Sequence, residues 1–195
     1  MTIDDYCIPY RGTPRSKESS VHAGRKRFEK AKEQAALTPV PREKIIALAN
    51  QFLREAGMEP CANPVFQLRP GQQVDYKKIQ KENGLQDKKD IVWMKFTRDG
   101  YLGVVAVSSD IGFDIPSSRE EYDELPPGTS GQKWRFSTAG ILVHFLGKQW
   151  DDSFVLVFPL KNMPEGYDRH RVETGIGNYL IANDVPILDF YSHNY

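Results

Sequence analysis

Cysteine is scarce in this sequence, which contains only Cys7 and Cys61 among 195 residues. Two cysteines so far apart do not form the disulfide framework that is typical of small secreted proteins. The N-terminal residues Met-Thr-Ile-Asp-Asp are acidic, whereas a secretory signal is first basic and then apolar. We therefore expect a reducing, cytoplasmic environment.

Long apolar runs are also missing from the chain. The longest ones, around residues 141–146 and 154–158, are far shorter than the roughly 20 residues of a membrane-spanning helix. This excludes an integral membrane protein with helical spans of the usual length, and we expect no contact with a membrane.

The chain has no net charge, since 26 Lys and Arg balance 26 Asp and Glu. The charges are unevenly placed, however. Residues 1–40 hold eight basic against five acidic residues (8 − 5 = +3), and the remainder holds eighteen against twenty-one (18 − 21 = −3). We therefore divide the chain into a basic N-terminal arm, flexible or ordered by a partner, and a single domain over residues 41–195.

What the sequence does contain is enough apolar material for a folded core. Its 39% hydrophobic and 11% aromatic content is typical of a globular domain, and 195 residues can bury such a core without disulfides or metals.

Hydrophobic periodicity predicts helices over residues 42–56 and 168–183. A shorter helix is predicted from Asp75, a good N-cap, to Gly84. Residues 25–37 have high helix propensity but few apolar residues, so this helix is either solvated or completed by a partner.

Strands are predicted by β-branched and aromatic runs. The strongest signal is a hairpin over residues 91–107, turned at Asp-Gly. A second hairpin is predicted from residues 133–146 and 153–160, a last strand from 185–191, and an extended edge segment between the prolines of 59–70. Together these elements indicate an α+β fold, with a largely antiparallel β-sheet and packed helices.

A polar cluster in the C-terminal half is the first candidate for chemistry. His170 and Glu173, at i and i+3, share one face of a predicted helix and could hold a divalent metal together with His144, Asp189 and His193. The same spacing arises on any polar helix, so we favour a solvated helix face and predict no metal site.

Arg171 joins His170 and Glu173 as a candidate catalytic residue. In a metal-free phosphodiester-cleaving enzyme, His170 would act as the base and a neighbouring arginine would neutralise the phosphorane. Adjacent helical residues point in different directions, which weakens this reading. A metal-dependent nuclease is weakened too, because Lys95 lacks an acid two residues before it. No cofactor motif is present, and the cofactor is left open.

The arm is the second candidate, because clustered cations neutralise phosphates and aromatic residues stack on bases. Its predicted binding residues are Arg11, Arg15, Lys17, Arg25, Lys26, Arg27 and Lys30. A third candidate is the acidic stretch of residues 120–124, which could meet a basic surface.

Three functions are compatible with these patterns. The one we favour is a non-catalytic binding protein that recognises a protein or nucleoprotein partner, with the arm adding electrostatic contact. The alternatives are a phosphodiester-cleaving enzyme that uses the C-terminal cluster, and a self-associating structural protein in which the arm of one copy contacts the body of another.

Overall fold

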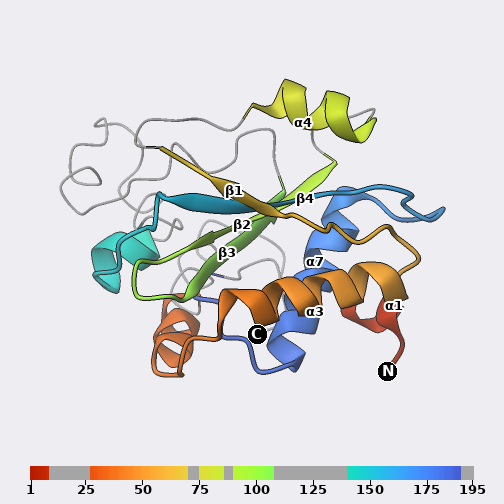
Figure 1. Cartoon of the computed structure of the whole chain (residues 1–195). Coiled ribbons are helices and arrows are strands. Elements are labelled where there is room, and N and C mark those ends of the chain that lie inside the picture. The colour runs from red at the N-terminus through yellow and green to blue at the C-terminus, as the bar shows by residue number, and fades with distance from the viewer. Residues whose placement is uncertain (9–26, 70–74, 86–89, 108–139, 190–195) are drawn as a thin grey trace, which may run out of the picture.

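The computed structural model of the chain describes residues 1–8, 27–69, 75–85, 90–107 and 140–189. In this part of the chain, four antiparallel strands form a sheet in the order β1-β4-β2-β3, and helices pack against it (Figure 1). The predicted α+β class with an antiparallel sheet is confirmed.

The central hairpin consists of β2 (Ile91–Phe96) and β3 (Leu102–Val107). Its turn contains Gly100 with a φ of 92°, a conformation that side chains other than glycine rarely adopt. The Asp-Gly hairpin is thus confirmed. β4 (Phe154–Pro159) pairs with β2 on one side and with the three-residue edge strand β1 (Val65–Gln67) on the other.

The second predicted hairpin is wrong in its first half. Residues 140–145 form a π-helix, η1 (Gly140–Phe145), instead of a strand, and residues 133–139 lie outside the described residues. An apolar run without strict alternation fits a strand and a buried helix equally well. Moreover, β4 already has neighbours on both sides, β1 and β2, so no position beside it is open.

One face of the sheet is covered by α3 (Arg42–Glu55) and α7 (Arg169–Ala182), and the short α1 (Ile3–Tyr6) packs on α7 (Figure 1). Both long helices match the predicted ones. α7 lies so close to its neighbours that a Cβ atom on Gly175 would be 2.3 Å from Phe52 Cζ and 2.8 Å from Cys7 Sγ. Glycine at this position therefore permits the close packing of α7.

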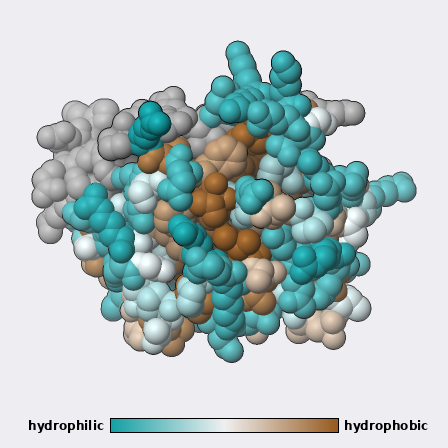
Figure 2. All heavy atoms as spheres, viewed as in Figure 1, coloured by the Kyte–Doolittle hydropathy of each residue, from teal (hydrophilic) through white to brown (hydrophobic). Residues whose placement is uncertain are grey.

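The other face carries α4 (Tyr76–Asn83) and η1. As predicted, Asp75 caps α4 by accepting a hydrogen bond from the Lys78 N–H (3.0 Å), and Gly84 ends it in the left-handed conformation. In the view of Figure 2, apolar residues form a band between α4 and α3, bordered by hydrophilic residues. A second core lies between this face of the sheet and the helices α4 and η1, and its buried residues include Ile79, Ile91, Trp93, Val104, Leu142, Val143, Trp150 and Leu188.

The last strand was predicted over residues 185–191, of which residues 190 and 191 lie outside the described part of the chain. Residues 185–189 do not form this strand. They make a single parallel bridge, between Ile187 and Leu102, and the N–H groups of Leu188 and Asp189 donate to the carbonyls of Leu102 and Gly103. Pro186 has no N–H to donate. The segment is nevertheless docked, since Ile187 and Leu188 are fully buried.

We expect Gly103→Ala to destabilise the protein by about 1 to 2 kcal/mol, the usual cost of overpacking. A Cβ atom at this position would lie 2.4 Å from the buried ring of Trp150. Urea unfolding measures the change. In the double variant Gly103→Ala/Trp150→Phe the smaller ring leaves room, so the two effects should be non-additive. Additive effects would show that the methyl group is accommodated elsewhere.

Candidate functional site

The structure places His170 and Glu173 together on the first turns of α7. The His170 Nδ1 atom lies 4.0 Å from a Glu173 carboxylate oxygen, with the imidazole exposed and the carboxylate largely buried. Burial raises the Glu173 pKa to about 7, although a hydrogen bond with the Val107 backbone acts in the opposite direction. The predicted shared helical face therefore exists, and it contains one buried and one exposed titratable group.

Arg171 has other partners. It lies in the same turn, but its Nη2 atom donates to Asp4 in α1 (2.8 Å), and its guanidinium lies over the ring of Tyr167. The Tyr167 hydroxyl donates to the same Asp4 carboxylate (2.5 Å). Both hydrogen bonds lower the Asp4 pKa, and the one from Tyr167 has the larger effect. Arg171 thus holds residues 1–8 on α7.

Asp189 has a similar structural partner. Its buried carboxylate accepts two hydrogen bonds of 2.7 Å from Arg27 Nη2 and a third, of 3.2 Å, from Arg27 Nε. His144 lies near the end of η1, where its ring meets the edge of Phe145. His193 lies outside the described residues. Among the residues that the structure describes, no group of three or more His, Cys, Asp or Glu side chains could hold a metal ion.

The described part of the arm packs on the body. Residues 27–35 are helical, as predicted, with Ala31 fully buried. Gln34 accepts a hydrogen bond from the Ile187 N–H (3.3 Å), and the Tyr101 hydroxyl donates to the carbonyls at the helix end. We refer to residues 27–35 below as the arm helix.

Of the predicted binding cations, two are described. Arg27 is the partly exposed partner of the buried Asp189, and Lys30 pairs with Glu33 on the surface of the arm helix (3.0 Å). The other five, Arg11, Arg15, Lys17, Arg25 and Lys26, lie outside the described residues, as does the acidic stretch 120–124.

Lys95, which the sequence analysis weighed only as part of a nuclease motif, is a buried charge in β2. Its side chain is 2% exposed, and its ammonium group pairs with Asp152 (2.8 Å) above the ring of Trp150. The sequence signal was a single lysine within the apolar run Ile-Val-Trp-Met-Lys-Phe. The pair joins the centre of the sheet to the start of β4.

Comparison with known proteins gives no matching family model, no matching curated protein and no matching solved structure. In the described ranges, no helix combines the length and the apolar character that crossing a membrane requires.

Proposed function

We propose that this protein is a non-catalytic binding protein, whose basic arm contacts a nucleoprotein or another polyanionic partner. The observation that carries this proposal is the engagement of Arg171 and Asp189. Both were candidates for chemistry, and both bind the arm instead, Arg171 through Asp4 and Asp189 through Arg27. A catalytic constellation requires side chains that converge on one reacting centre.

The positive charge of residues 9–26 gives the proposal its electrostatic basis. Residues 9–26 join two segments that pack on the body, residues 1–8 and the arm helix, and contain five cations against one acid, Glu18 (5 − 1 = +4). A cluster of this kind attracts phosphates and releases their counterions. The free thiols of Cys7 and Cys61 support a reducing, cytoplasmic setting.

The alternative of phosphodiester cleavage retains one supporting observation. A buried carboxyl group with a pKa of about 7 beside a histidine is the kind of pair that general acid–base catalysis uses. Burial of Glu173 in a helix that packs on the core explains its raised pKa equally well without any catalysis. The proposed binding function therefore has priority, and one experiment separates the two.

The experiment measures binding of the full chain to labelled single- and double-stranded DNA and RNA across a salt series. We expect salt-sensitive binding, and we expect the triple variant Arg11→Gln/Arg15→Gln/Lys17→Gln to weaken it. The slope of log K against log salt should fall by roughly 3, about one unit for each lost phosphate contact.

The matched control is Lys77→Gln/Lys78→Gln/Lys81→Gln, which removes the same charge from the exposed side of α4. Equal effects of the two triple variants would contradict a specific role of the arm. Each tube also receives Mg²⁺ and is checked for intact nucleic acid. Cleavage that His170→Ala abolishes would favour the enzyme, and an absence of binding by wild-type protein would point to an acidic protein partner.

A further inference from the structure

Residues 1–8 lie on α7 in the manner of a bound peptide. The Asp4 carboxylate accepts hydrogen bonds from Tyr167 Oη (2.5 Å) and Arg171 Nη2 (2.8 Å). The backbone carbonyl of Tyr6 accepts a third from Asn178 Nδ2 (2.7 Å). One side chain and one backbone group of the segment are thus recognised by polar groups of α7 and of Tyr167, which lies two residues before it.

Two apolar contacts complete the recognition. The Tyr6 ring packs edge to face against Tyr179, with 5.1 Å between the centroids. Cys7 is 6% exposed and occupies the space above Gly175 that a larger residue would fill. We call this surface, formed by Tyr167, Arg171, Gly175, Asn178 and Tyr179, the α7 docking surface. No residue of α1 itself is buried, so the docking depends on a few directional contacts and on Cys7.

The connection between this segment and the rest of the chain is long. Residues 9–26 give eighteen residues between Ile8 and Arg27. A fully extended chain of this length reaches roughly 60 Å, whereas a compact chain of this size has a radius of gyration of only about 16 Å. The α7 docking surface of a neighbouring copy is therefore within the reach of the segment.

We propose that the α7 docking surface of one copy binds residues 1–8 of a second copy, which produces an arm-exchanged dimer. The docking surface and its ligand belong to the same chain, so the same contacts can form within one copy and between two. Exchange of an identical element is a low-cost route to a closed twofold dimer. The balance between monomer and dimer then depends on protein concentration and on the length of the connection.

A charge swap tests this exchange in the full chain. Asp4→Arg and Arg171→Asp each place two like charges at the contact between positions 4 and 171, which we call the clasp. Neither variant should therefore dock its segment, either within one copy or between two copies of the same variant. In an equimolar mixture, Arg at position 4 meets Asp at position 171 only across copies, and both clasps of a dimer are complementary. We expect each variant alone to sediment as a monomer and the mixture to form a species of twice the mass.

The variants should remain folded. Both side chains are partly exposed, and an acid in the first turn of α7 is favourable to the helix dipole. Carrying both changes in one chain restores the clasp and should restore wild-type behaviour. A mixture that stays monomeric, while circular dichroism shows both variants to be folded, would overturn the proposal.

A second measurement uses wild-type protein alone and does not depend on the variants. Isotopically heavy and light copies are mixed, concentrated and analysed by native mass spectrometry. Exchange predicts dimers of intermediate mass, whose abundance rises with concentration and falls when excess peptide of residues 1–8 is added. An absence of mixed dimers up to millimolar concentration, where cis and trans docking should compete, would also overturn the proposal.

Discussion

Replacing Glu173 with Gln is expected to stabilise the protein at pH 8 and to leave its stability near pH 4.5 almost unchanged. The Glu173 carboxyl group has a pKa of about 7, raised from 4.5 by burial. The protonated form therefore costs little in the folded protein, whereas the ionised form is disfavoured there. Ionisation of Glu173 therefore lowers the free energy of unfolding by about 3 kcal/mol at pH 8.

The sign follows from proton linkage. Between pH 4.5 and pH 7 the folded protein binds more protons at this site than the unfolded chain, so stability decreases as the pH rises. Above pH 7 the full penalty remains. Gln cannot ionise, and its carbonyl oxygen can still accept a hydrogen bond from the Val107 N–H. We therefore expect the variant to unfold about 5 to 10 °C higher than wild type at pH 8.

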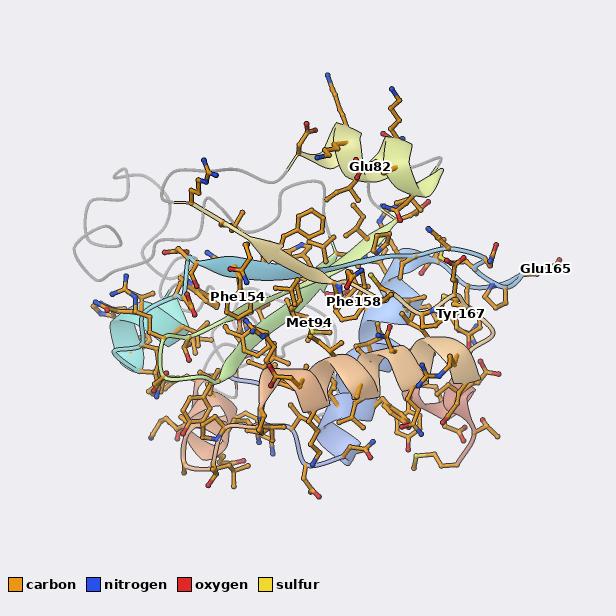
Figure 3. The ribbon with its side chains drawn as sticks, viewed as in Figure 1. Glu82, Met94, Phe154, Phe158, Glu165 and Tyr167 are labelled. Carbon is orange, nitrogen blue, oxygen red and sulfur yellow. The ribbon has the colours of Figure 1, made fainter. Side chains whose placement is uncertain are left out.

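Thermal unfolding between pH 4.5 and pH 8.5 measures this effect. Glu165→Gln is the matched control, because Glu165 lies at the end of an exposed loop and points away from the body (Figure 3). The control should follow the wild-type pH profile. If Glu173→Gln destabilised the protein at pH 8, the carboxylate would have a compensating partner, and the argument from burial would fail.

Replacing Asp189 with Asn is expected to destabilise the protein by about 2 to 3 kcal/mol. Asp189 is 3% exposed at its side chain, and Arg27 is 17% exposed. Removing one member of a buried ion pair takes away the charge that compensates the other member most directly, and such a loss typically costs several kcal/mol. The partial exposure of Arg27 reduces that cost. Asn retains the shape of the side chain, so the effect is one of charge.

Urea unfolding gives the free energy, and amide hydrogen exchange tests its location. We expect faster exchange in the arm helix, because the arm helix and the end of the chain share this anchor. Asp184→Asn is the control, since Asp184 is exposed and has a positive φ of 61° that Asn also accepts. Unchanged exchange in residues 27–35 would show that the helix is held by other contacts, such as the packing of Ala31.

Local sequence signals account for much of this fold. The Asp-Gly turn of the β2–β3 hairpin, the Asp75 cap of α4 and the glycine that ends it each act through residues a few positions apart, so sequence alone located them. The π-helix of residues 140–145 was missed, because an apolar run has the same composition in a buried strand and in a buried helix. A strand at residues 140–145 could not pair with β4, because β1 and β2 already lie beside it, and that is a property of the whole sheet.

The candidate site was less accessible to sequence reasoning. His170 and Glu173 were correctly paired because their spacing is local. The partners of Arg171 and Asp189 are 167 and 162 residues away in the chain, and no spacing rule connects them. Arg27 was selected among the binding cations by charge alone. Its burial against Asp189 depends on how the arm helix packs on the body, which composition does not encode.

The contact of α1 with α7 also bears on the biosynthesis of the protein. Asp4 is translated long before Arg171, its ion-pair partner 167 residues later. At a synthesis rate of roughly 5 to 20 residues per second, that interval lasts about 8 to 33 s. The core beside α3 needs Ile176 and Leu180 of the same late helix. All four strands are therefore synthesised before α7, one of the two long helices that cover them, and residues 1–8 cannot dock natively until α7 has been made.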